Sequence, residues 1–93
     1  MNIFAGLTKY ATKYAVTNSR PLNEEELSGI LSAKVVSSSY GLSCCFFMTS
    51  GCQQYIPLSR DSVAQVGDVV DVNKLTVLTL ERDGSNPILR VEL

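Results

Sequence analysis

The feature that most constrains the fold is a series of short apolar runs, separated by turn residues, between residues 32 and 93. Apolar side chains in these runs recur mostly at every second position, which is the period of a strand with one buried face. The runs are AKVVSSS, LSCCFFMT, CQQYIPL, DVVDVNKLTVLTLER and ILRVEL. We therefore expect a mainly β fold, in which about five or six short strands form a small barrel over residues 32–93.

The residues before these runs have a helical period instead. Four large side chains recur at helical spacing: Ile3, Leu7, Tyr10 and Tyr14. They predict an amphipathic helix over residues 2–16, followed by a TNSRP linker at 17–21. With the second helix described next, this predicts a short N-terminal helical arm over residues 1–31, ahead of the barrel over 32–93.

The segment LNEEELSGIL predicts a second, brief helix that begins after Asn23. An Asn side chain can cap a helix, and the three glutamates that follow would lie in the first turn, where the helix dipole favours carboxylates. Gly29 disfavours a longer helix. The expected apolar side of this helix comprises Leu27, Ile30 and Leu31.

Composition excludes several classes of protein. The chain is 45% hydrophobic and 18% charged, as expected of a folded domain. A net charge of −1 argues against strong binding to duplex DNA, although it leaves room for a local basic groove. No segment approaches the roughly 20 apolar residues of a membrane span, and no basic region precedes the apolar N-terminal stretch. We expect no membrane partner, a cytoplasmic location and reduced cysteines.

No catalytic or metal-binding set emerges from the sequence. Histidine is absent, so a Ser–His or Cys–His nucleophile pair is impossible. Zinc usually takes four Cys or His ligands at close spacing, which Cys44, Cys45 and Cys52 do not provide. Asp68 and Asp71 would lie on opposite faces of a strand. We therefore expect no enzyme activity, no cofactor and no metal.

The turn at Ser50-Gly51 predicts the register of the second hairpin. A two-residue turn would place Phe46 opposite Tyr55 and Cys45 opposite Ile56, and residues directly opposite share a face. The face expected to form the core then contains Cys45, Phe47, Ile56 and Leu58. The other face contains Cys44, Phe46, Met48, Gln53, Tyr55 and Pro57.

The first hairpin allows two registers. A three-residue loop Ser39-Tyr40-Gly41, with Gly41 in the left-handed region, would place Lys34 opposite Phe46. A two-residue loop would place Lys34 opposite Phe47. The first register is preferred because it keeps the lysine out of the core, where an unpaired charge is costly.

In the preferred register, an aromatic face has cations at its edge. Bases stack on Phe and Tyr side chains at roughly 1–3 kcal/mol per base, while Lys and Arg contact phosphates. We therefore expect a non-enzymatic protein that binds single-stranded DNA or RNA. The predicted contact residues are Lys34, Tyr40, Phe46, Tyr55, Arg60 and Arg90.

The order of strands and turns over residues 32–93 resembles the oligonucleotide-binding (OB) fold of single-stranded DNA-binding proteins. A V-G-D-x-V motif, which fits the entry into a barrel strand, follows an irregular segment at 59–66. The resemblance implies that Phe46 and Tyr55, on the second and third barrel strands, stack bases, and that the loop carrying Tyr40 helps to clamp the nucleic acid. Unlike the family, this chain has no tryptophan, is slightly acidic and has a short connecting segment.

The stretch YIPLSRDS, beside this motif, is also similar to small bacteriophage or mobile-element proteins, which would place the protein in a host cytoplasm. Two alternatives stay open. The N-terminal helices could cover the aromatic face, or that face or the arm could bind protein, as in a homo-oligomeric assembly module or a phage accessory protein. The predicted oligomer interface comprises Ile3, Phe4, Leu7, Tyr10 and Tyr14.

Overall fold

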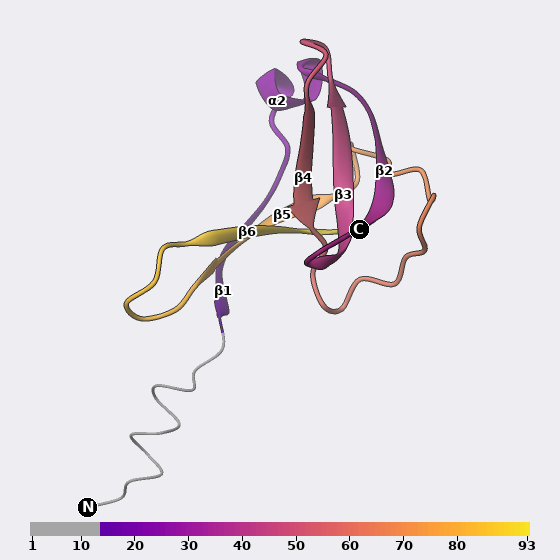
Figure 1. Ribbon diagram of the computed structural model, residues 1–93. Coiled ribbons are helices and arrows are strands. Elements are labelled where there is room, and N and C mark those ends of the chain that lie inside the picture. The colour runs from indigo at the N-terminus through magenta and orange to yellow at the C-terminus, as the bar shows by residue number, and fades with distance from the viewer. Residues whose placement is uncertain (1–13) are drawn as a thin grey trace, which may run out of the picture.

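The structure is a computed structural model that describes residues 14–93 and confirms the mainly β class. Six strands form two antiparallel sheets, with orders β2–β3–β4 and β1–β5–β6. The elements are β1 (Ala15–Pro21), α2 (Glu24–Ser28), β2 (Ile30–Ser38), β3 (Gly41–Met48), β4 (Gln53–Pro57), β5 (Thr76–Glu81) and β6 (Ile88–Glu92). In Figure 1, β3 and β4 lie side by side, and the β5–β6 hairpin passes across their lower end and extends beyond them.

The first sheet is a meander with two tight turns, and its three strands agree with the predicted ones apart from their end residues. Gly41 and Gly51 have φ angles of 94° and 89°, a region that favours glycine. Beyond β2, a short segment continues the sheet. The Val35 N–H donates to the Asp68 carbonyl oxygen at 2.8 Å, and the Gly67 N–H donates to the Val35 carbonyl oxygen at 2.8 Å. The V-G-D-x-V motif therefore covers the free edge of β2.

The predicted register of the second hairpin is wrong by one residue. Cys45 pairs with Tyr55 and Cys44 with Ile56. The cause is the turn, which contains the three residues 49–51 instead of two: the Gly51 N–H donates to the Met48 carbonyl oxygen at 2.9 Å, and the Met48 N–H donates to the Cys52 carbonyl oxygen at 2.9 Å.

Both registers considered for the first hairpin are also wrong. Lys34 pairs with Cys45, and Ser38 pairs with Gly41, so the loop is Ser39-Tyr40 and Gly41 is the first residue of β3. Gly41 has the positive φ that was predicted, but it is the first residue of β3 and not, as expected, the last residue of the loop.

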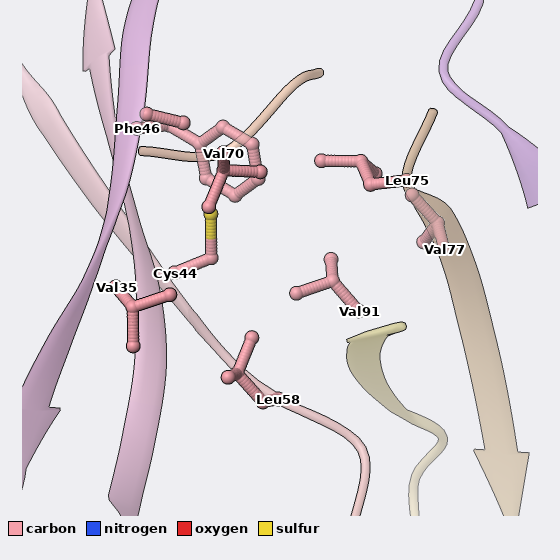
Figure 2. Close-up of a cluster of buried hydrophobic side chains, with 9 residues drawn as sticks. Val35, Cys44, Phe46, Leu58, Val70, Leu75, Val77 and Val91 are labelled. Atoms are coloured by element: carbon pink, nitrogen blue, oxygen red, sulfur yellow. The ribbon is translucent and has the colours of Figure 1, made fainter. Parts of the chain in front are cut away.

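These shifts exchange the two faces of β3. Phe46 is only 3% exposed and belongs to the hydrophobic core together with Cys44, whereas the predicted core residue Phe47 is only half-buried and lies outside this core. Leu58 is buried in the core, as predicted. Figure 2 shows the Phe46 and Cys44 side chains pointing towards the second sheet, where Val91 faces them.

The second sheet begins with a strand that the sequence did not predict. β1 pairs with β5 from Ala15 opposite Glu81 to Pro21 opposite Thr76, with a bulge between Val16 and Asn18. The predicted linker at 17–21 and the last residues of the predicted helix are therefore strand. The rest of that helix lies outside the described residues. The β-branched side chains of this segment suit an exposed strand.

Only part of the long apolar run at 68–82 is a strand. The chain bends where a bend near Asn73 was predicted: the Lys74 N–H donates to the Asp71 carbonyl oxygen at 3.0 Å, and the Asn73 N–H donates to Asp71 Oδ1 at 3.0 Å. β5 begins after this turn, and it is joined to β6 by the predicted turn at 83–87.

The brief second helix is confirmed as α2. The Asn23 side chain accepts from the Glu26 N–H at 2.7 Å, and the Glu26 carboxylate accepts from the Asn23 N–H at 3.0 Å, which is a complete capping box. Gly29 ends the helix, as predicted. Of the expected apolar side, Leu27 and Ile30 are half-buried, but Leu31 is 72% exposed.

The two sheets are not closed into a barrel, which corrects that part of the prediction. An isolated parallel bridge pairs Leu58, just after β4, with Val91 of β6 and so links the two sheets. A second isolated bridge pairs Lys34 of β2 with Val69. The core fills the space between the sheets (Figure 2). Its buried members are Ala33, Val35, Cys44, Phe46, Leu58, Val70, Leu75, Val77 and Val91. A long helical arm is likewise not seen among the described residues, whose helix is the five-residue α2.

Candidate functional site

Three side chains form a row across the outer face of the β2–β3–β4 sheet, away from the core. Lys34 and Tyr55 both pair with Cys45, one from each side, and directly paired residues share a face. Cys45 is 2% exposed, whereas Tyr55 is 56% exposed. The cysteine is therefore the covered centre of a row that presents a cation and an aromatic ring to solvent.

Phe47 lies on the same face of β3, two residues beyond Cys45. The Lys34 Nζ lies 5.5 Å from the centroid of the Phe47 ring, within the range of a cation–π contact. Phe47 is half-buried and Lys34 is exposed, so the contact is open on its outer side. Below, the name aromatic row refers to three side chains of this face that are not fully buried: Lys34, Phe47 and Tyr55.

The Tyr55 hydroxyl is held by its neighbours. It donates to Gln53 Oε1 at 2.7 Å. Its interaction with the Cys45 thiol raises the pKa of Tyr55 above its usual value. On the opposite face, burial raises the pKa of Cys44 to about 12. A thiol with this pKa is not a nucleophile at neutral pH.

A hollow of about 700 Å³ lies beside the aromatic row, where the two sheets meet. Tyr55 belongs both to the row and to the hollow. The other large side chains of the hollow are Tyr40, Pro57, Ile88 and Leu89. Its remaining lining residues are Ser38, Ser39, Ser43 and Arg90. The hollow therefore has apolar and aromatic walls with one charged group.

Local hydrogen bonds position the loop that carries Tyr40. The Ser38 Oγ accepts from the Tyr40 N–H at 3.2 Å and lies 2.9 Å from the buried Ser43 Oγ. Tyr40 itself is exposed. Opposite this loop, Arg90 Nη1 donates to the Leu58 carbonyl oxygen at 2.8 Å, which ties the guanidinium to the junction of β4 and β6.

The three strands that carry this surface contain one charged residue, Lys34, although the chain as a whole is slightly acidic. All nine carboxylate side chains lie outside residues 27–60, and that stretch carries Lys34 and Arg60. It contains the whole of β2, β3 and β4. The sheet face that holds the aromatic row is therefore free of carboxylates from its own strands, which favours an anionic ligand.

Of the predicted nucleic-acid contacts, the structure brings three together around the hollow: Tyr40, Tyr55 and Arg90. Lys34 lies in the row beside Tyr55. Phe46 does not belong to this surface, because its ring is buried in the core and cannot stack on a base. Arg60 is exposed in the turn after β4 and does not line the hollow.

The predicted oligomer interface is described only at Tyr14. Its ring is half-buried, and the Arg82 guanidinium carbon lies 4.8 Å from its centroid. The remaining predicted interface residues, Ile3, Phe4, Leu7 and Tyr10, lie outside the described residues. The predicted covering of Tyr55 by helices is not seen within residues 14–93, where Tyr55 is exposed.

Sequence reasoning missed Phe47, Ile88 and Leu89 as surface residues. Phe47 was hidden by the register error in the second hairpin. For Ile88 and Leu89 a signal exists: they are consecutive apolar residues, so one of them must lie off the buried face of β6. Alternation alone does not indicate that this exposed residue would meet Tyr55 of the other sheet.

The structure also bears on metals and membranes. Within residues 14–93, no group of three or more His, Cys, Asp or Glu side chains is arranged to hold a metal ion. In the same part of the chain, no helix has the length and apolar character needed to cross a membrane.

Comparisons with known proteins find no counterpart: no protein-family model, no curated protein and no solved structure matches this chain. The function is therefore argued from the geometry of the aromatic row and the hollow.

Proposed function

We propose that the protein binds single-stranded nucleic acid, without chemistry, through the aromatic row on the outer face of β2, β3 and β4. The observation that carries this proposal is the placement of an exposed tyrosine and a half-buried phenylalanine beside a lysine, on strands that contain no carboxylate. Aromatic rings accept the face of any base, and the lysine attracts the phosphate backbone.

The resemblance to OB-fold proteins supports the same surface. Tyr55 and Phe47 lie on β4 and β3, the third and second strands of the segment that resembles this family, and those are the strands on which the family stacks bases. Phe47 takes the place that was predicted for Phe46. The exposed Tyr40 lies in the loop before β3, where the resemblance implies a clamp.

The energy of each contact sets the expected affinity. One base stacked on an aromatic side chain contributes roughly 1–3 kcal/mol, so two rings and a few phosphate contacts give modest binding. With a net charge of −1, the protein as a whole does not attract a polyanion. The affinity should therefore depend on the local surface and fall steeply as salt is added.

Fluorescence anisotropy with labelled dT12, rU12 and a 12-base-pair duplex, at low salt, tests the proposal. We expect the single strands to bind and the duplex to bind more weakly. The variant Tyr55→Ala should weaken binding of the single strands roughly 5- to 150-fold, the loss of one stacked base. Tyr14→Ala, which removes a tyrosine beside Arg82, serves as the control. Absence of binding to both single strands at low salt would refute the proposal.

Self-association is a second candidate function, and exposed apolar side chains of the β1–β5–β6 sheet favour it. Val16 pairs with Leu80, and Leu80 pairs with Ile88, so these three apolar side chains share one face of the sheet; Val16 is about half exposed and the other two are half-buried. Exposed apolar side chains that gather in one patch often mark subunit contacts. Sedimentation velocity over a hundredfold range of protein concentration tests this candidate. A sedimentation coefficient that does not change over this range would exclude self-association under those conditions.

A further inference from the structure

The hollow beside Tyr55 has a composition that the stacking surface alone does not require. Its volume of about 700 Å³ lies within the range of small-molecule sites, roughly 300–1,000 Å³. Its large lining side chains are Tyr40, Tyr55, Pro57, Ile88 and Leu89. Two of these are aromatic and three are aliphatic, so the walls suit a flat, largely apolar group.

The charged side chain in the wall of the hollow indicates that the ligand also carries an anionic group. Among residues 14–93, Arg90 is the one charged residue that lines it, and no carboxylate of that part of the chain does. The Arg90 guanidinium is fixed by its 2.8 Å hydrogen bond to the Leu58 carbonyl oxygen. A guanidinium has five N–H donors, and within residues 14–93 Leu58 is its one hydrogen-bond acceptor. The site therefore favours a ligand that combines a flat ring with an anion.

A nucleotide has this combination of groups, and the hollow is continuous with the surface proposed to bind a strand. Tyr55 contributes to both. A strand that stacks on the outer side of Tyr55 can therefore direct its next base into the hollow. That base has to be unpaired, because a base inside a duplex enters a pocket only after it has been unstacked and unpaired, which costs free energy.

We propose that the hollow between β4 and β6 receives one unpaired base of the bound strand, with Arg90 contacting the adjoining phosphate. This inference rests on the proposed function, and it gives that function a preference for single strands. Tyr40 and Leu89 would flank the inserted base, and Tyr55 would separate it from the base stacked on the aromatic row.

Two leucines near the end of the chain provide a matched pair of variants. Leu89 lines the hollow and is 48% exposed, whereas Leu93 does not line it and is 45% exposed. Leu89→Glu places a carboxylate where the base and phosphate would lie, so it should weaken dT12 binding about tenfold or more, a loss comparable with one stacked base. Leu93→Glu makes the same change of charge and should weaken dT12 binding less than about twofold, because it is not part of the site.

Amide chemical shifts of the unmodified full chain provide a readout that does not depend on the folding of a variant. On titration with dT12, we expect shifts in the aromatic row and also at Ser39, Tyr40, Ile88 and Leu89. Shifts confined to the row, together with equal effects of the two leucine variants, would overturn the inserted base and leave the proposed function intact. Absence of any shift would overturn both.

Discussion

Tyr55 lies directly opposite Cys45 across β3 and β4, with the tyrosine more than half exposed and the cysteine almost completely buried. The neighbouring residue of β3, Cys44, faces the other way and belongs to the core. Adjacent residues of β3 therefore face the hydrophobic core and the outer face of the sheet in turn. Substitutions at adjacent positions should affect stability in one case and ligand binding in the other.

Phe46 and Phe47 provide the clearest contrast between these two roles. Phe46→Ala should lower the free energy of unfolding by about 3–5 kcal/mol, since it removes a fully buried ring from the core. Phe47→Ala should lower it less and weaken dT12 binding instead. Urea unfolding and anisotropy measure the two effects. The assignment of the faces would be wrong if Phe47→Ala were the more destabilising variant.

Lys34 should contribute one phosphate contact. Removing its charge in Lys34→Gln should weaken dT12 binding and reduce the slope of log affinity against log salt by about 1. Lys74→Gln is the matched control, because Lys74 is an exposed lysine in the turn before β5. Binding measured from low to moderate salt gives the slopes. Equal slopes for both variants and the unmodified protein would exclude Lys34 from the interface.

The three cysteines should differ in reactivity. Cys52 is exposed, whereas Cys44 and Cys45 are buried, and burial raises the pKa of Cys44 to about 12. At neutral pH, Ellman's reagent should therefore modify one thiol rapidly in the native protein and all three after unfolding in denaturant. Cys52→Ser should abolish the rapid phase. Rapid modification of two thiols in the native state would contradict the burial of the pair.

The ion pair between Arg20 of β1 and Glu26 of α2 should make the free energy of unfolding depend on pH. The Arg20 guanidinium, with help from the Asn23 N–H, holds the pKa of Glu26 below its usual value of 4.5. A lowered folded-state pKa means that this contribution is present above pH 4.5 and is lost as the pH falls through the lower folded-state value.

Glu26→Gln tests this pH dependence, because glutamine can still complete a capping box but carries no charge. The variant should be less stable than the unmodified protein at pH 7, and the difference should shrink as the pH falls below 4.5. Thermal unfolding across this range measures it. A difference that does not change with pH would show that the ion pair contributes nothing.

Gly51 should tolerate no side chain without loss of stability. Its φ of 89° lies in a region that L-residues rarely adopt, although nothing lies within 4 Å of a Cβ built there. Gly51→Ala should therefore destabilise the protein by roughly 1–3 kcal/mol through backbone strain alone. Chemical unfolding measures this loss. An unchanged stability would indicate that the turn adopts another conformation.

The positions of β2, β3, β4, β5 and β6 could be predicted from the sequence because turn residues mark their ends. The helix α2 could also be predicted, because Asn23 and Glu26 form a capping box within four residues of chain. These signals are local. Each depends on backbone preferences of a few neighbouring residues and does not need a distant partner.

The faces of β3 could not be predicted, because this strand is apolar at both alternating sets of positions. The prediction that Leu58 faces the core is confirmed. However, Gly51 fits a two-residue or a three-residue turn, and the observed three-residue turn transfers the core role from the predicted Phe47 to Phe46. β1 could not be predicted either, because its partner β5 lies far along the chain and leaves no local signal.

The pairing of β1 with β5 has a consequence for synthesis. The strands of the meander, β2 to β4, meet neighbours in sequence and can assemble as soon as Pro57 has left the ribosome. β1 emerges earlier but has to wait until β5 has been translated, and pairing across such a long loop is the slower kind of folding event. The nascent chain therefore carries an unpaired strand edge for most of its translation.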